Sequence, residues 1–221
     1  VAAMTDRATI ITVLNGTAFG QVWRIRLVFA AVAAGLSVRQ RGGGRRLLLV
    51  MAAFQVASLG WIGHAAMEEG MAGLFQRANQ SVHLLAGGAW IGALPSILIL
   101  LVVARNNAAG GEVETVLRRF SGYGVAAVVL LLISGMVNVW VRSGGRFLSL
   151  YGPYGQILLV KVLLVGGMIG LALANRALVA PVLSKRVPRR RIILCINVLV
   201  ETLLGLSVLF AAFVLGNSPP P

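Results

Sequence analysis

Acidic residues, tyrosines and cysteine are scarce in this chain. Of its 221 residues, six are acidic, three are tyrosine and one is cysteine. Charged residues make up 12% of the chain. A soluble globular domain carries about 25%, so this shortage excludes an ordinary soluble domain. The single thiol, Cys195, excludes an intrachain disulfide framework, and we expect it to lie among apolar neighbours.

Long apolar runs take the place of the missing charge. Hydrophobic residues make up 58% of the chain. A membrane-spanning helix needs about 20 mostly apolar residues. The pattern predicts an all-α, polytopic membrane helix bundle with about six transmembrane helices. We expect residues 1–221 to form one transmembrane bundle that begins with an interfacial segment, 1–20. The predicted spans are 21–38, 47–63, 81–104, 120–141, 156–178 and 191–215.

Basic residues give the chain a formal net charge of +14. We interpret this charge as an orientation signal and expect no nucleic acid partner, because most basic residues lie in the loops after the first, third and fifth spans. Loops rich in Lys and Arg face the cytoplasm. Both termini are therefore predicted to be periplasmic. The loop residues concerned are Arg39, Arg41, Arg45, Arg46, Arg105, Arg118, Arg119, Arg176, Lys185, Arg186, Arg189, Arg190 and Arg191.

A sequence similarity links the first and fifth spans. The stretch AFGQVWRIRL, which begins at Ala18, aligns with PYGQILLVKV, which begins at Pro153. In both copies a basic residue, Arg26 or Lys161, follows the glycine by six positions. We interpret this as a possible parallel internal repeat, in which spans one and two correspond to spans five and six. It suggests an ancestor of four plus four helices, of which two are absent here.

Both histidines lie at predicted span ends on the periplasmic side. His64 ends the second span, His83 opens the third, and Met67, Glu68 and Met71 lie between them. Imidazole and thioether ligands suit copper, and thioethers favour Cu(I). These five residues are the candidate metal site. The alternative is that the histidines are interfacial hydrogen-bonding groups and the methionines are apolar plugs over the bundle.

Ionisable and amide groups inside predicted spans cost free energy because they are removed from water, and they often have a function. Glu201 lies near the middle of the last span, and Lys161, Arg26 and Asn175 are its candidate partners along an intramembrane polar or ion path. A structural ion pair between helices is the competing interpretation. Trp90 is expected to pack in the core, with lining of a site as the alternative.

Glycines in the third span indicate close helix packing. Gly87, Gly88 and Gly92 lie within one short stretch of this span. Small residues in membrane helices let a neighbouring helix approach closely.

Four segments resemble one known family. They are WIGHAA…VHLLAGGAWIGAL, ISGMVNVWVRSGG…YGPYGQILLVKVLL, ALANRALVAPVL and VETLLGLSVLFAAFVLGNSPP. In this order they resemble the copper resistance protein D family (CopD/PcoD). The resemblance implies a bacterial inner-membrane protein, with more helices than are found here, that transports or handles copper, often beside a periplasmic CopC-type copper-binding protein. It also places His64, His83, Lys161, Asn175 and Glu201 on family motifs.

The combined hypothesis is a non-enzymatic copper transporter. Copper, as Cu(I) or Cu(II), is captured by His64, His83, Met67 and Met71 with Glu68 nearby, and passes into the bundle towards Glu201. Two alternatives stay open. One is a membrane electron carrier with haem b between the two histidines, and the other is a structural subunit that binds other membrane subunits.

Overall fold

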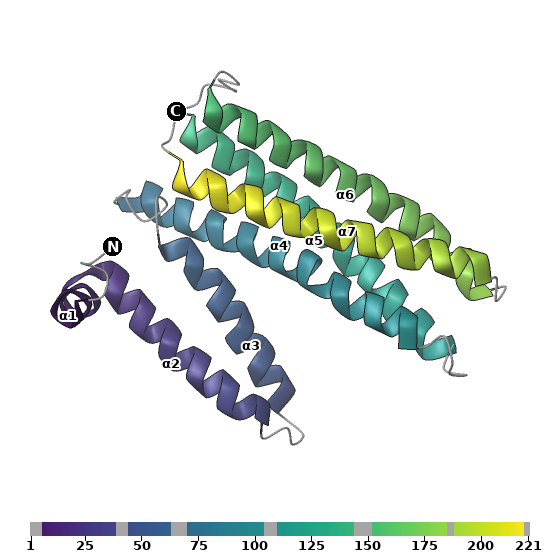
Figure 1. The fold of residues 1–221 in the computed structure, drawn as a ribbon, viewed down its shortest axis with the longest axis horizontal. Coiled ribbons are helices and arrows are strands. Elements are labelled where there is room, and N and C mark those ends of the chain that lie inside the picture. The colour runs from purple at the N-terminus through teal and green to yellow at the C-terminus, as the bar shows by residue number, and fades with distance from the viewer. Residues whose placement is uncertain are drawn as a thin grey trace. The chain divides into compact units, whose positions relative to one another are not determined.

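The computed structural model describes residues 6–38, 44–62, 70–103, 110–143, 152–184 and 188–218. This part of the chain contains seven α-helices and one short 3₁₀ helix, so the all-α prediction is confirmed (Figure 1). Two compact units can be distinguished, Val1–Leu85 and Ala86–Pro221. Their boundary falls within one helix, α4.

Five of the helices are long and apolar enough to cross a membrane. They are α2 (Ala18–Val38), α4 (Gly70–Val103), α5 (Gly110–Arg142), α6 (Pro153–Ser184) and α7 (Pro188–Asn217). All five overlap predicted spans. Long apolar segments of this kind form helices in lipid because the helix satisfies every backbone polar group internally.

The predicted span 47–63 differs from the structure. It is divided between α3 (Gly44–Ala57) and the 3₁₀ helix η2 (Ser58–Trp61). At the rise of an α-helix, α3 is about 21 Å long. The hydrocarbon core of a bilayer is about 30 Å thick, so α3 alone is too short to cross it. Five helices rather than six therefore qualify as spans in the described part of the chain.

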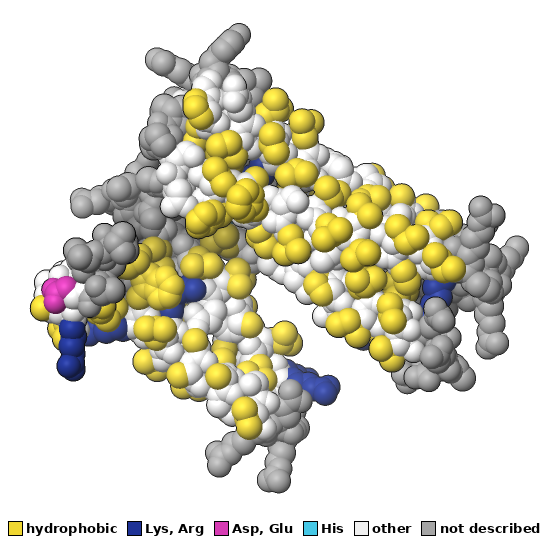
Figure 2. Space-filling view, viewed as in Figure 1, with side chains coloured by type: hydrophobic (Ala, Val, Ile, Leu, Met, Phe, Trp, Pro, Cys, Tyr) yellow, Lys and Arg dark blue, Asp and Glu magenta, His cyan; other side chains and the backbone are white. Residues whose placement is uncertain are grey.

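Apolar side chains cover the outer faces of these helices. Leu163, Phe210 and Phe213 are each between 65% and 69% exposed although they lie on predicted spans. Figure 2 shows hydrophobic side chains along the helices, with Lys and Arg mostly near helix ends. Exposure of large apolar residues on long helices is what a lipid environment requires.

In the first unit, α2 and α3 are joined by reciprocal polar contacts. Arg26 on α2 donates from Nη1 to the backbone oxygen of Gln55, at 2.6 Å, and to Oγ of Ser58. The Gln55 amide donates back to the Arg26 backbone oxygen, at 2.7 Å. The rings of Phe29 and Phe54 pack with centroids 4.4 Å apart. The guanidinium is therefore part of the structural link between these two helices.

The start of α4 packs closely against η2. Ser81 donates from Oγ to the backbone oxygens of Ala57, at 2.8 Å, and Arg77, at 2.9 Å. A Cβ on the buried Gly60 would lie 2.6 Å from that Oγ. The helix begins at Gly70, which has a φ of +72°, well before the predicted start at residue 81. Ser81 is thus an internal helix residue that fixes a helix contact.

A short helix precedes α2. This helix, α1 (Arg7–Gly16), begins at Asp6, whose carboxylate accepts hydrogen bonds from the backbone N–H of Ala8 and Thr9. Asp6 is an N-cap of the preferred type. The element lies within the segment predicted to be interfacial, and that placement stays a prediction.

Asp6 makes the first turn of α1 sensitive to acid. Its pKa lies below the usual value of 3.8, chiefly because the Thr9 hydroxyl donates to the carboxylate. A lowered pKa gives a contribution that is present above the unfolded value and is lost as the pH falls through the lowered pKa. We expect the protection factors of the Ala8 and Thr9 amides, which compare measured with intrinsic exchange, to fall as the pH drops through the lowered pKa of Asp6, as measured by NMR. The variant Asp6→Ala should show low protection factors without this fall, and equal profiles of protection against pH in the two proteins would contradict the capping role.

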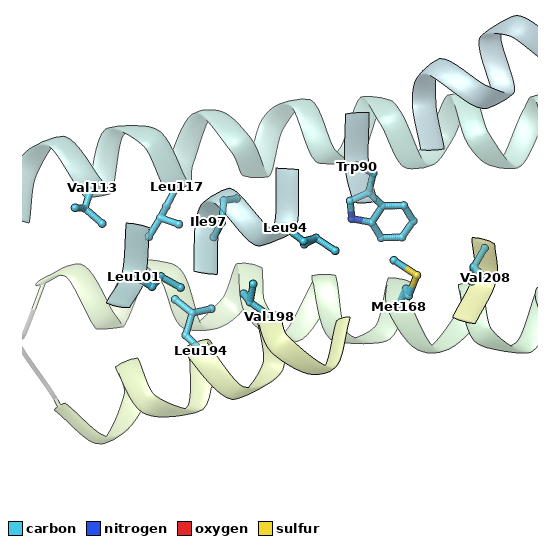
Figure 3. Packing of buried hydrophobic residues seen from close by; sticks show 10 residues of the cluster. All are labelled: Trp90, Leu94, Ile97, Leu101, Val113, Leu117, Met168, Leu194, Val198 and Val208. Atoms are coloured by element: carbon cyan, nitrogen blue, oxygen red, sulfur yellow. The ribbon is translucent and has the colours of Figure 1, made fainter. Parts of the chain in front are cut away.

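In the second unit, one face of α4 forms the core. Trp90, Leu94, Ile97 and Leu101 recur at helical spacing and are at most 5% exposed. Figure 3 shows them beside residues of the neighbouring helices, namely Val113, Leu117, Met168, Leu194, Val198 and Val208. At the end of α4, Arg191 donates from Nη2 to the backbone oxygen of Leu101, at 2.6 Å. A cation at a helix C-terminus satisfies a carbonyl that has no partner within the helix.

Candidate functional site

A buried carboxylate lies at the centre of the second unit. Glu201, on α7, is 2% exposed. Trp90 on α4 donates from Nε1 to its Oε1, and Asn175 on α6 donates from Nδ2 to its Oε2, each at 3.0 Å. Three helices therefore meet at one carboxyl group. Both donors are neutral, so the carboxylate is solvated by dipoles and not by a cation.

The side-chain oxygen of Asn175 is buried and unpaired in the described part of the protein. The residue is 8% exposed, and its Oδ1 has no hydrogen-bond partner within the described part of the protein. Unpaired buried polar atoms are uncommon in native structures and call for an explanation.

A cavity of about 180 Å³ adjoins this group. It is lined by Glu201, Asn175 and Trp90, by Arg176 on α6, and on the α5 side by Ser121, together with apolar residues. A water molecule in the liquid occupies about 30 Å³, so the cavity has room for several. The lining is mostly apolar, so the polar cluster borders a space with room for a small guest.

The candidate partners of Glu201 separate into two groups. Asn175 is confirmed as a contact. Lys161 precedes Asn175 by fourteen residues on the continuous helix α6. That separation is about 21 Å along the helix axis, which excludes an ion pair between Lys161 and Glu201. Arg26 makes its hydrogen bonds with Gln55 and Ser58 inside the first unit.

The candidate metal ligands are only partly described. His64, Met67 and Glu68 lie outside the described residues. Met71 is in the first turn of α4 and is 81% exposed, whereas His83 is partly buried on the same helix. Within the described ranges, no three His, Cys, Asp or Glu side chains come together as a metal site.

The continuous helix limits how these ligands can act. Met71 and His83 are twelve positions apart on α4, which corresponds to about 18 Å along the axis. Ligand bonds to a metal ion are about 2 Å long. Met71 and His83 therefore cannot bind one and the same ion while α4 keeps this form.

Two features of the site were not evident in the sequence. The hydrogen bond from Trp90 to Glu201 joins residues 111 positions apart, which no local pattern reveals. A tight contact is found at Gly205 on α7, where a Cβ would lie 3.0 Å from Cγ2 of Ile91 on α4. By contrast, a Cβ at Gly92 would meet nothing within 4 Å and one at Gly87 would make an ordinary 3.4 Å contact. For Gly88, close helix packing stays a prediction.

Two sequence families match separate parts of this chain. Residues 114–215 match Copper resistance protein D, and residues 1–74 match Copper resistance protein D-like, N-terminal domain. The chain belongs to the copper resistance protein D family. The first match lies within the unit that carries Glu201, and the second within the unit that carries Arg26. The resemblance inferred from the four segments is confirmed.

Curated relatives agree with this assignment. The chain is 32% identical over 166 residues to inner membrane protein YebZ of Escherichia coli K12, covering 75% of this chain and 56% of that protein. It is 31% identical over 180 residues to copper resistance protein D of Pseudomonas syringae pv. tomato, covering 78% and 58%. It is 27% identical over 165 residues to copper transport protein CutJ of Bacillus subtilis, covering 72% and 28%.

This chain spans little more than half the length of the relatives from Escherichia coli and Pseudomonas syringae. Neither the matched families nor these relatives are described as enzymes. No solved structure matches the chain.

Proposed function

We propose that this protein transports or handles copper across the bacterial inner membrane. Two of its relatives are named for copper resistance and copper transport, and a third is named an inner membrane protein. The observation that supports it best is the buried Glu201 cluster in the unit that matches the family. A carboxylate held in a membrane-spanning helix is costly and marks ion pathways in other membrane proteins. Copper is the cargo in this proposal.

Copper enters along a route on the periplasmic side. His64, Met67, Glu68 and Met71 receive the ion, and His83 takes it over further along α4. Met71 and His83 are about 18 Å apart along the helix. Copper therefore passes from one ligand to the next and is not held by both at the same time. Thioether and imidazole ligands suit Cu(I) on such a route.

Within the membrane, polar groups follow. Trp90 lies seven residues after His83, close to two turns along α4, and donates to Glu201. Glu201, Asn175, Lys161 and Arg26 are the polar side chains that we assign to this path. Arg26 acts through the contact between α2 and α3.

The topology in this proposal has six crossings and periplasmic termini. The helix α3 rises about 21 Å. The four residues of η2 add about 8 Å at the rise of a 3₁₀ helix. Together they reach about 29 Å, close to the thickness of the hydrocarbon core.

The parallel repeat and the partners belong to the same proposal. The helices α2 and α6 begin at the aligned residues Ala18 and Pro153. A periplasmic CopC-type protein would deliver the copper, and other membrane subunits are candidate partners.

Copper uptake by histidine variants tests the proposal. We expect His64→Ala and His83→Ala each to lower uptake into cells or proteoliposomes by about tenfold or more. Even outer partners of metal ligands cost about 10- to 100-fold in affinity, and a direct ligand costs at least as much. Uptake is measured by metal analysis after a fixed time, at matched protein levels.

The matched control is Val82→Ala, which removes an exposed side chain next to His83. It should transport like the unaltered protein. Unchanged uptake in both histidine variants would end the proposal. An absorption spectrum of the purified protein distinguishes the electron-carrier alternative, since a haem between His64 and His83 would give a sharp band on reduction.

A further inference from the structure

We propose that Glu201 is a proton-binding site in the membrane, with Asn175 as the partner whose amide adjusts to each protonation state. The coupling of this proton to copper rests on the proposed function, whereas the proton site itself does not. The hydrogen bonds of the cluster and the unpaired Oδ1 of Asn175 support this assignment.

The orientation of the Asn175 amide in the structure suits an ionised Glu201, because its Nδ2 faces the carboxyl oxygen. A carboxylate accepts hydrogen bonds and donates none. Trp90 Nε1 and Asn175 Nδ2 supply one donor to each oxygen, both at 3.0 Å. Oδ1 of Asn175 then remains without a partner in the described part of the chain.

The protonated state can keep the same number of hydrogen bonds. One proton from a hydronium ion of the aqueous phase adds to Oε2 of Glu201 and leaves a water molecule behind. This turns the carboxylate into a neutral acid, and no electron moves. Rotation of the Asn175 amide by half a turn exchanges its nitrogen and oxygen, so that Oδ1 accepts the new O–H. Trp90 continues to donate to Oε1. Neither state leaves the carboxyl group without partners, and such a pair can change protonation without losing a buried hydrogen bond.

The ligand chemistry favours a proton over copper at this position. The cluster offers a carboxylate and an amide oxygen, whereas Cu(I) prefers thioether, thiolate or imidazole. Met168 is buried in the adjoining hydrophobic core and does not line the cavity. A site built from hard oxygen atoms is suited to a proton.

The surrounding charges also fit this role. Arg176 lines the same cavity from α6 and is exposed. Arg191 on α7 is bonded to the Leu101 carbonyl. Lys161 on α6 is about 21 Å from Asn175 along the axis. The described part of α4 in this unit, residues 86–103, contains no charged residue. On α5, the exposed residues Arg118 and Arg119 lie in sequence between the cavity-lining Leu117 and Phe120, and Arg142 ends the helix. Within the described residues, no cation is paired with Glu201. A bound proton is therefore what neutralises the charge of its carboxylate.

Infrared difference spectroscopy tests the proton site directly. The full chain in lipid nanodiscs is titrated from alkaline to acid pH, and the carbonyl stretch of a protonated carboxyl group is followed. We expect a titrating band that is absent in Glu201→Gln and restored, at another frequency, in Glu201→Asp. The glutamine matches the shape and hydrogen bonds of the protonated glutamate, so the helices should stay assembled. Absence of a band that depends on Glu201 would overturn the proposal.

Two further variants test the partners. Trp90→Phe removes the donor to Oε1, so the carbonyl band should rise in frequency. Asn175→Leu should change the pH at which the band appears, because the amide no longer pairs with either state. Thr202→Val, which alters a polar neighbour bonded to its own helix, should leave the band unchanged. A band that responds equally to all three would show that it does not arise from this cluster.

Proton release during copper transport separates this inference from the proposed function. With a pH-sensitive dye inside proteoliposomes, copper addition should move protons in the unaltered protein and not in Glu201→Gln. Failure of copper binding together with a titrating Glu201 band would reject the proposed function and keep the proton site. Copper transport without any proton movement in the unaltered protein would reject the coupling.

Discussion

Replacing Trp90 with alanine is expected to lower the free energy of unfolding of the Ala86–Pro221 unit by about 3 kcal/mol. Large-to-small changes of Trp in soluble cores cost about 3–5 kcal/mol, of which the transfer from water falls away in lipid. The loss of the indole N–H adds a cost, because Oε1 of Glu201 loses its donor. Trp90 is 2% exposed and belongs to the core cluster, so a void would remain. Denaturation in detergent micelles, followed by circular dichroism, measures the change.

Trp90→Phe separates packing from hydrogen bonding. It keeps most of the ring volume and removes the donor, so we expect a smaller loss of about 1–3 kcal/mol. If the alanine and phenylalanine variants were equally stable, the packing of Trp90 would contribute nothing measurable. If both matched the unaltered protein, Trp90 would not hold α4 to α7 at all.

Gly60→Ala is expected to destabilise the Val1–Leu85 unit by about 2 kcal/mol, because it overpacks a tight helix contact. The added Cβ would lie 2.6 Å from Oγ and 2.9 Å from the backbone nitrogen of Ser81, and 3.0 Å from the backbone oxygen of Arg77. Two of these three atoms belong to the backbone of α4 and cannot rotate away. Overpacking of this kind costs about 1–3 kcal/mol. The same denaturation experiment measures it.

Gly92→Ala is the matched control. A Cβ at that position meets nothing within 4 Å. Alanine is a better helix former than glycine by about 1 kcal/mol. The control should therefore be neutral or stabilising. Equal destabilisation by both substitutions would show that the cost arises from the glycine-to-alanine change itself and not from contact with Ser81.

The sequence predicted helices well where composition alone decides them. Length and hydropathy identified α2, α4, α5, α6 and α7 because lipid imposes a minimum apolar length on each. The start of α4 was misplaced, because the predicted span 81–104 left out the polar residues that precede it. They lie inside the helix, where Ser81 bonds to the Arg77 and Ala57 carbonyls. The division of span 47–63 into α3 and η2 depends on packing at Gly60, which is a tertiary contact.

The sequence identified the buried polar residues of the candidate site, but it did not show which of their atoms form hydrogen bonds with one another. Glu201 stood out because a carboxylate within an apolar run needs compensation. Asn175 was recognised as a possible partner. The structure assigned the second donor to Trp90, which had been expected mainly to pack, since an indole can do both at once. Distances of this kind depend on how α4, α6 and α7 assemble.

An ionised Glu201 would also respond to the voltage across the membrane. Within the described residues both of its hydrogen-bond donors are neutral, so its charge would experience the electric field across the bilayer. Moving one elementary charge through the whole field is worth about 2.3 kcal/mol per 100 mV. Occupancy of Glu201 by a proton would then depend on how strongly the cell energises its membrane, and a de-energised cell would have a different ratio of the two states at the same pH.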